Sequence, residues 1–324
     1  MTRHHQPFVM PTLIAVVAAL VVGCSPSGGL GPVPSPAPTP APSVDQGPPD
    51  LTPAPPAVPS ASASPVGSPE ASPTASAGPT TIVRAYFYLG GELGTAGPVP
   101  LLREVPETRA VATAAMNELL AGPRPQESGG REITSAVPDG SRLLGLSVDN
   151  GIATVDLSRE YESGGGSMSM AVRLGQVVYT LTQFPTVQAV LFEIEGRAVT
   201  VFSSEGLILD GPVGRANYDD LLPAIFVDRP AYGAGLGNPA RITGTANVFE
   251  AAFLITLLDG SGATLVEVPA MATCGTGCRG TFDVTLRYSV PAAGWGTLRV
   301  WDGSAKDGSP ENVREYPIWL TPAP

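Results

Sequence analysis

The acidic residues are the side chains in this sequence that could carry out catalysis. Asp156, Glu160 and Glu162 follow one expected strand, and Glu193 and Glu195 lie at the end of another. Two carboxyl groups about 5–9 Å apart across a cleft can cleave a glycosidic bond, one as the acid and the other as nucleophile or base. Acidic residues are also common wherever strands end in a hydrophilic protein. We prefer this second interpretation and assign no catalytic residue.

Histidine chemistry is excluded by position. The two histidines, His4 and His5, both precede residue 10, in a segment that we expect to be removed. The remaining chain could form neither a Ser-His-Asp or Cys-His arrangement nor a histidine-ligated zinc site. Catalysis would have to use carboxylates, Tyr, Arg or Lys306, which is the single lysine. No cofactor is expected.

Two cysteines stand close together as Cys-Gly-Thr-Gly-Cys, at Cys274 and Cys278. In an exported protein such a pair can close a tight disulfide loop. A zinc site needs four ligands, and no histidine or further structural cysteine is present to complete the set. We predict a structural disulfide, and two free thiols or a redox or metal role stay open as alternatives.

Two further groups of residues could bind a ligand. The run Gly164–Gly166 opens a helix and could offer amides to an anion, but it lacks a GK[ST] or GxGxxG pattern and is read as a flexible connector. Asp302, Ser304 and Asp307, with Asp259 on another turn, could supply oxygen ligands to Ca²⁺. EF-hand spacing is absent and Asp-Gly pairs are primarily turn residues, so no metal site is assigned.

The aromatic residues Trp295, Trp301, Tyr316 and Trp319 are concentrated near the C-terminus. Aromatic rings on an exposed face could stack on glycan rings or dock another protein. Trp301 and Trp319 alternate with polar neighbours, which favours core packing. Trp295 lies between two glycines and is expected to be exposed.

The N-terminus has the pattern of a bacterial lipoprotein signal. Arg3 provides a positive charge, and Phe8 to Val22 is an apolar run that is too short for a comfortable membrane span. Val-Val-Gly-Cys at its end resembles a lipobox, which implies cleavage after residue 23 and a lipid on Cys24. An uncleaved anchor with an incidental cysteine is the alternative.

Residues 24–80 are expected to be a disordered tether. Pro (36) and Gly (38) account for 74 of the 324 residues, and this segment is rich in Pro, Ala and Ser with no aromatic residue. Such a composition cannot bury enough apolar surface to offset its chain entropy. Its Pro-x-Pro alternation favours extended polyproline II, so the tether is a semi-rigid spacer.

Residues 81–220 predict an α+β domain. Strands are expected at 82–89, 144–148, 153–157, 187–194 and 198–202, and helices at 107–121 and 170–181. Apolar residues recur at helical spacing in the two helices, and Asn150-Gly151 is typical of a type I′ hairpin turn. The predicted order is β-α-β-β-α-β-β, with the helices on one face of the sheet.

Residues 224–324 predict an immunoglobulin-like β-sandwich. The helical period is lost, and strand-like runs lie at 225–227, 240–245, 252–258, 264–268, 281–288, 297–301 and 316–320. Glycine-rich turns separate these runs, for example Asp259-Gly260-Ser261-Gly262. About seven short strands in a hundred residues are typical of such a sandwich. The boundary is expected near Asp219 to Pro223.

Several spaced motifs between residues 82 and 203 resemble the GerMN domain of sporulation and spore-germination proteins. Glu118 to Pro123 matches the family's helix ending in LLxGP, and Ala153 to Tyr161 matches its next strand and turn. The C-terminal region, with Ile242 to Ala251 and Leu258 to Gly262, is similar to the immunoglobulin-like domain found behind GerMN domains. The resemblance implies a noncatalytic envelope or assembly role and transfers no catalytic residue.

These observations lead to one expected function and one alternative. The formal net charge of -11 argues against a nucleic-acid partner, which normally meets a basic surface. We expect a lipid-anchored protein on the outer face of a bacterial cytoplasmic membrane that presents two domains to an envelope protein or to peptidoglycan. The alternative is a carboxylate-dependent enzyme that acts on peptidoglycan or another envelope glycan.

Overall fold

The computed structural model describes residues 78–91, 95–127 and 133–323. The predicted signal peptide, Cys24 and almost all of the predicted tether lie outside the described residues. The described residues belong to one compact unit. Within them, no helix is long and apolar enough to cross a membrane.

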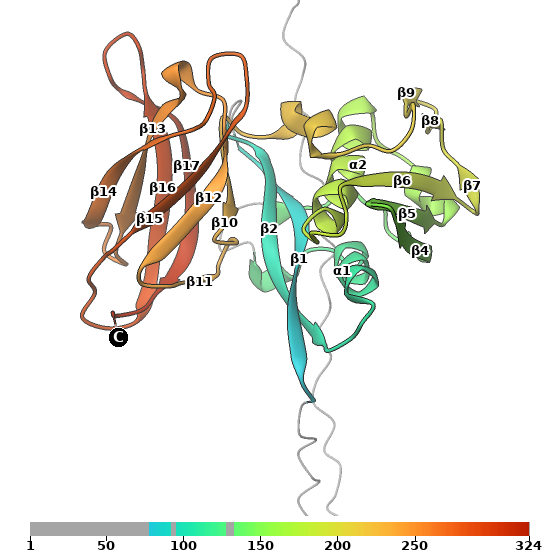
Figure 1. Cartoon of the computed structure of the whole chain (residues 1–324), viewed down its shortest axis with the longest axis horizontal. Coiled ribbons are helices and arrows are strands. Elements are labelled where there is room, and N and C mark those ends of the chain that lie inside the picture. Colours follow the sequence, from blue (N-terminus) through green and yellow to red (C-terminus); the bar gives the residue numbers. More distant parts are fainter. Residues whose placement is uncertain (1–77, 92–94, 128–132, 324) are drawn as a thin grey trace, which may run out of the picture. The chain divides into compact units, whose positions relative to one another are not determined.

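The first sheet is built on a long antiparallel hairpin (Figure 1). Its strands, in the order β2-β1-β3, are β1 (Thr80–Leu89), β2 (Gly97–Pro106) and β3 (Ile133–Thr134). The sequence predicted β1 but not β2, because Pro98 and Pro100 argue against a strand. β2 lies at the edge of its sheet, where a residue without an N–H is tolerated.

The second sheet contains a parallel pair joined by a helical crossover. Its order is β4-β5-β6-β7, with β4 (Leu143–Asp149), β5 (Ile152–Leu157), β6 (Ala189–Ile194) and β7 (Arg197–Ala198). β4 and β5 are antiparallel and meet at Asn150 and Gly151, whose φ values of 48° and 85° fit the expected type I′ turn. β5 and β6 are parallel. β8 (Val201–Phe202) and β9 (Leu207–Ile208) form a separate small hairpin.

The α-helices among the described residues are α1 (Val111–Leu120) and α2 (Ser167–Leu181). α2 connects β5 to β6 and is buried along most of its length. Both helices contact β1, while α1 also contacts β4 and α2 also contacts β6. The prediction of helices covering one face of a single sheet is therefore wrong, since they contact strands of two sheets. The additional strands β2 and β3 also lengthen the predicted β-α-β-β-α-β-β order.

Side chains of α2 and of Gln183, just after it, occupy the open edge of β1. Gln183 accepts from the N–H of Arg84 (2.8 Å) and donates to its carbonyl oxygen (2.7 Å). Thr180 accepts from the N–H of Tyr86 (3.1 Å), and Gln176 donates to the Tyr86 carbonyl (2.9 Å). The backbone groups of a buried strand edge need hydrogen-bond partners. Here these three side chains provide them.

The C-terminal part is a β-sandwich (Figure 1). One sheet has the order β10-β12-β15, from β10 (Ile225–Arg229), β12 (Ala240–Ala246) and β15 (Gly280–Leu286). The other has the order β11-β17-β16-β13-β14, from β11 (Gly235–Leu236), β13 (Ala252–Leu258), β14 (Thr264–Met271), β16 (Gly294–Gly303) and β17 (Pro310–Leu320). Each of the seven predicted strands is present, and the short β11 is added. Inward residues such as Ile242, Ile255 and Val300 are fully buried between the sheets.

Candidate functional site

The junction between the α+β part and the sandwich holds a cluster of buried and partly buried polar side chains. Tyr86 of β1 donates to Asp228 of β10 at 2.5 Å, and Arg215 lies 3.5 Å from the same carboxylate oxygen. Arg215 also donates to the Tyr86 hydroxyl (3.3 Å) and stacks over Tyr179 at 4.6 Å from the ring centre. Burial, followed by the negative charge of Asp228, raises the pKa of Tyr86 to about 12. The cluster joins the two parts through charge-assisted hydrogen bonds.

A second contact across the junction is made by Arg314 of β17. Its guanidinium donates to the carbonyl oxygens of Thr95 (3.0 Å), Gly97 (3.4 Å) and Pro98 (2.9 Å), at the start of β2. Arg314 is only 2% exposed. A guanidinium withdrawn from water must be paired, and these carbonyls pair it across the junction.

A cavity of about 600 Å³ lies at this junction. Tyr179, Arg215 and Asp228 line one side. The other side is the outer face of β12 and β15, where Arg241 and Asp283 form an ion pair at 2.5 Å. Threonine hydroxyls complete the wall, from Thr243, Thr245, Thr273 and Thr281. The lining is mixed in charge and rich in hydrogen-bonding groups.

The acidic residues proposed from the sequence perform structural tasks. Asp156 and Glu193 lie opposite each other on β5 and β6. Asp156 accepts from the N–H of Gly196 (2.9 Å) and Glu195 accepts from the N–H of Arg159 (3.1 Å), so both hold the turns at the ends of these strands. These bonds give Asp156 and Glu195 a structural role in the turns that follow the strands.

Glu160 is poorly suited to act as a general acid. A hydrogen bond with Ser158, followed by one with its own backbone, lowers the pKa of its carboxyl group, and Arg142 lies 3.7 Å away. A general acid at neutral pH needs a raised pKa, usually through burial. Glu162 lies near Glu195 in the wall of a cavity of about 410 Å³, but that wall also carries Arg159 and Arg197.

The glycine run before α2 is held by a buried arginine. Arg173 is 2% exposed and donates to the carbonyls of Ala136 (2.8 Å), Tyr161 and Gly164 (3.0 Å). Gly164 and Gly165 have φ values of 62° and 85°, which favour glycine. The run therefore serves as a defined turn that is fastened through its carbonyl oxygens.

The residues considered for Ca²⁺ lie in two places, Asp259 in the turn after β13 and the other three at the end of β16 and in the turn after it. Asp259 accepts from Ser261 and Ala263 within its own turn, and Asp307 accepts from Ser309 in the same way. Asp302 accepts from the side chain of Asn312 (2.9 Å). Among the residues with described positions, no three Asp, Glu, His or Cys side chains come together as a metal site would require.

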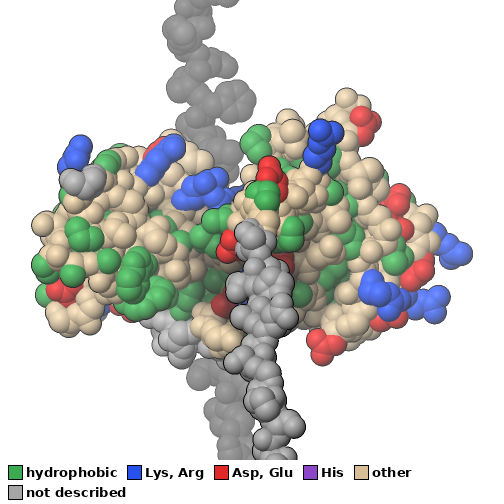
Figure 2. Space-filling model, turned by 90° about the horizontal axis from the view of Figure 1, so that it is seen from below, with side chains coloured by type: hydrophobic (Ala, Val, Ile, Leu, Met, Phe, Trp, Pro, Cys, Tyr) green, Lys and Arg blue, Asp and Glu red, His purple; other side chains and the backbone are tan. Residues whose placement is uncertain are grey.

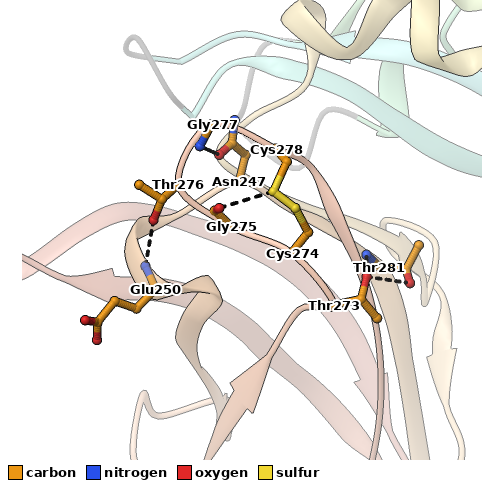
Figure 3. The surroundings of a disulfide bond; sticks show 9 residues. All are labelled: Asn247, Glu250, Thr273, Cys274, Gly275, Thr276, Gly277, Cys278 and Thr281. Atoms are coloured by element: carbon orange, nitrogen blue, oxygen red, sulfur yellow. Dashed lines mark hydrogen bonds between the residues drawn. A yellow bond between two sulfur atoms is a disulfide. The ribbon is translucent and has the colours of Figure 1, made fainter. Parts of the chain in front are cut away.

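A disulfide joins Cys274 and Cys278, as predicted, with their Cα atoms 5.8 Å apart (Figure 3). The loop that it closes packs on the turn after β12. The N–H of Gly277 donates to the Asn247 side chain (3.1 Å), and Thr276 accepts from the N–H of Glu250 (2.9 Å) (Figure 3). The disulfide therefore braces one end of the sandwich.

Two of the three tryptophans are exposed on the sandwich. Trp295 of β16 and Trp319 of β17 lie opposite each other, with ring centres 5.4 Å apart at an angle of 84°. They are 55% and 39% exposed. Trp295 was expected at the surface, but core packing was wrong for Trp319, because the inward positions of β17 are taken by its neighbours Ile318 and Leu320. Trp301 is partly buried and donates to Thr256 (3.1 Å).

Tyr316 is fully buried and accepts from the N–H of Val227 (3.3 Å).

Sequence reasoning missed the junction residues Tyr86, Arg215 and Asp228 altogether. They lie far apart in the chain, and no motif connects them. Figure 2 shows basic and acidic side chains at separate places on one face, rather than one continuous basic stripe.

Comparison with known proteins assigns families to both parts. Residues 84–200 match the Germane family, described as sporulation and spore germination. Residues 224–309 match the immunoglobulin-like domain of bacterial spore germination. No curated protein matches the chain.

Two similar solved structures come from the sporulation protein GerM of Bacillus subtilis. The tandem GerMN domains are 14% identical over 59% of this chain, with a TM-score of 0.36, and the match spans 60% of that structure. The first GerMN domain is 20% identical over 41% of this chain, with a TM-score of 0.34, and the match spans 98% of that structure. The resemblance inferred from the motifs is confirmed by the family matches. The chain therefore contains a sporulation and spore germination domain that is followed by an immunoglobulin-like domain of bacterial spore germination.

Proposed function

We propose that the protein is a noncatalytic, lipid-anchored component of a bacterial cell envelope that presents two binding domains to protein or peptidoglycan partners. A lipid on Cys24 would hold it at the outer face of the cytoplasmic membrane, and residues 24–80 would space the domains from that membrane. The main support for this proposal is the junction, where Arg314 and the Tyr86–Asp228–Arg215 cluster fix the two domains to each other.

A fixed junction favours binding because it presents surfaces of both domains in one constant arrangement. A binding surface that need not be ordered on contact loses less conformational entropy. An enzyme would instead need carboxyl groups whose environments push their pKa values apart. The acids near the strand ends hold backbone turns, and the pKa of Glu160 is lowered. Both family descriptions name sporulation and germination proteins.

Incubation of the purified protein with peptidoglycan sacculi tests this proposal. We expect no soluble fragments by chromatography, and the same result for Asp156→Asn, Glu160→Gln and Glu193→Gln. Loss of a general acid or base costs about 10²–10⁴-fold in rate. Release of fragments by the wild type that one of these substitutions abolishes would contradict the proposal.

The anchor is tested by fractionation of cells that produce Cys24→Ala protein. We expect this variant to leave the membrane fraction or to remain as an uncleaved precursor. Cys278→Ser is the matched control, because it also replaces one cysteine and should still be processed and anchored. A Cys24→Ala protein that migrates and fractionates like the wild type would show that the lipid anchor is wrong.

Partners are tested by chemical cross-linking of the anchored protein in whole cells, followed by mass spectrometry. Cross-links from both domains to the same envelope protein, or to wall material, would support presentation by a single unit. Cross-links that never include residues 84–200 would contradict the two-domain proposal.

A further inference from the structure

Trp295, one member of the exposed tryptophan pair, lines a cavity that both domains help to form. This cavity measures about 380 Å³. Trp295 and Pro317 form its wall on the sandwich, and Leu101 and Leu102 of β2 form the wall opposite. Its size falls within the range of small-molecule pockets. We name Trp295, Trp319 and this cavity together the tryptophan platform.

The exposure of the two indoles is not required by the fold. Neighbouring inward positions on the same strands, such as Leu298 and Ile318, are fully buried and already fill the core. Trp295 and Trp319 touch each other edge to face and leave more than a third of each side chain in water. Exposed aromatic surface of this size commonly marks a site of interaction.

Charges around the platform are paired. Arg299 and Glu315, next along the outer face of β16 and β17, form an ion pair at 2.7 Å. Glu127, in the cavity wall, is held by both terminal nitrogens of Arg103. The surface therefore offers aromatic area and hydrogen-bonding groups with little net charge. It would not attract a strongly charged polymer electrostatically.

We infer that the tryptophan platform binds an uncharged polysaccharide strand, the class to which the glycan backbone of peptidoglycan belongs. A pyranose ring has an apolar C–H face that can lie on an indole and hydroxyl groups at its rim that hydrogen-bond. Trp295 supplies the ring at the cavity mouth, and Gln126 in the cavity wall supplies an amide. This inference rests on the proposed function and names the partner class for one of its surfaces.

Further aromatic and polar side chains continue the platform along strand β16, so a linear polymer could contact several of them at once. Trp301 follows Trp295 on β16 by six residues, a distance of about 20 Å along a strand. The Arg299–Glu315 pair lies between them and offers polar groups to hydroxyls. A linear chain of sugars matches this sequence of aromatic, polar and aromatic surface.

Calorimetric titration of the full-length protein in detergent with an N-acetylglucosamine hexamer tests the inference. We expect saturable binding that weakens about tenfold or more in Trp295→Ala and in Trp319→Ala, as for an aromatic residue at the centre of an interface. Trp295→Phe keeps an aromatic face and should retain most of the affinity. Phe249→Ala is the matched control, because Phe249 is 58% exposed on a different part of the sandwich and should bind like the wild type.

Two further probes separate the possible partners. The amount of each variant that sediments with purified sacculi should rank in the same order as its affinity for the hexamer. A poly-L-proline decapeptide, which suits aromatic grooves that bind proteins, should not compete with the hexamer. Equal affinity of Trp295→Ala and wild type, or tight binding of the decapeptide alone, would overturn the inference.

These outcomes differ from those that would remove the proposed function. If wild type and Trp295→Ala sediment equally with sacculi, wall binding stands and the platform is not its site. If the wild type binds neither probe, the inference fails while a protein partner is still tested by cross-linking. Release of glycan fragments would instead refute the noncatalytic function.

Discussion

Replacement of Arg314 by Met should separate the two domains. Met has a similar length but no charge, so the carbonyls of Thr95, Gly97 and Pro98 would lose their shared donor. Leaving a buried carbonyl oxygen without its donor costs about 1–3 kcal/mol, so we expect Arg314→Met to lose about 3 kcal/mol. A typical domain has a free energy of unfolding of about 5–15 kcal/mol, so the variant should still fold.

The sequence itself provides separate reporters for the two domains. The three tryptophans all lie in the sandwich, so fluorescence follows the unfolding of that domain. Both α-helices lie in the first domain, so circular dichroism at a helical wavelength follows the other. In urea the wild type should give coincident transitions, whereas Arg314→Met should give two separated ones, since coincidence of probes marks cooperative unfolding.

Arg299→Met is the matched control for this experiment. Arg299 also lies in the sandwich and pairs with a carboxylate, but its side chain is 38% exposed and its partner Glu315 belongs to the same domain. Such exposed pairs contribute about 0–1 kcal/mol, so the transitions should remain coincident. Coincident transitions in Arg314→Met, with a loss below about 1 kcal/mol, would refute a junction fixed by this arginine.

Three other changes test the interior of the molecule. Gln183→Leu removes both bonds to the backbone of Arg84 and should cost about 2–3 kcal/mol in urea unfolding, whereas a cost near zero would show that water replaces them. Tyr86 is fully buried and its pKa is raised to about 12, so its neutral form is favoured in the folded state. The stabilisation that comes from this raised pKa is complete below pH 10 and is lost as the pH rises towards 12, by up to about 3 kcal/mol. Over the same pH range the free energy of unfolding of Tyr86→Phe should fall less than that of the wild type. An equal fall would contradict the raised pKa of Tyr86. The pair Cys274→Ser and Cys278→Ser opens a small loop and should cost about 2 kcal/mol, with no further loss when reductant is added.

The sequence predicted those elements whose pattern is local. Strands such as β13 have the expected bounds because apolar and turn residues within a few positions determine them. The turn at Asn150-Gly151 depends on two residues that tolerate positive φ, and it was predicted correctly. β2 was missed because Pro98 and Pro100 lower strand propensity, and only its place at a sheet edge makes them acceptable.

The candidate sites were harder to predict because they depend on long-range contacts. Tyr86 and Asp228 are 142 residues apart, and neither has a neighbour in sequence that signals a polar cluster. Trp319 was assigned to the core because it was taken to alternate with polar neighbours, but its neighbours Ile318 and Leu320 are apolar and occupy the inward positions. The sequence correctly located acidic residues at the ends of strands. It could not predict their hydrogen bonds to backbone N–H groups, because these depend on the folded chain.

The junction and the tryptophan platform are physically linked, which gives a final prediction. Leu101 of the first domain and Trp295 of the second face each other across the 380 Å³ cavity, so the cavity exists only while the junction holds. Arg314 does not line this cavity, yet Arg314→Met should weaken binding of the N-acetylglucosamine hexamer. The apparent affinity falls in proportion to the fraction of molecules that keep the competent arrangement. Measured below the first urea transition, Arg314→Met should bind more weakly than the wild type, and Trp295→Ala should add little to its loss. If Arg314→Met binds like the wild type while its transitions are separated, the indoles alone form the site and the wall from β2 is unnecessary.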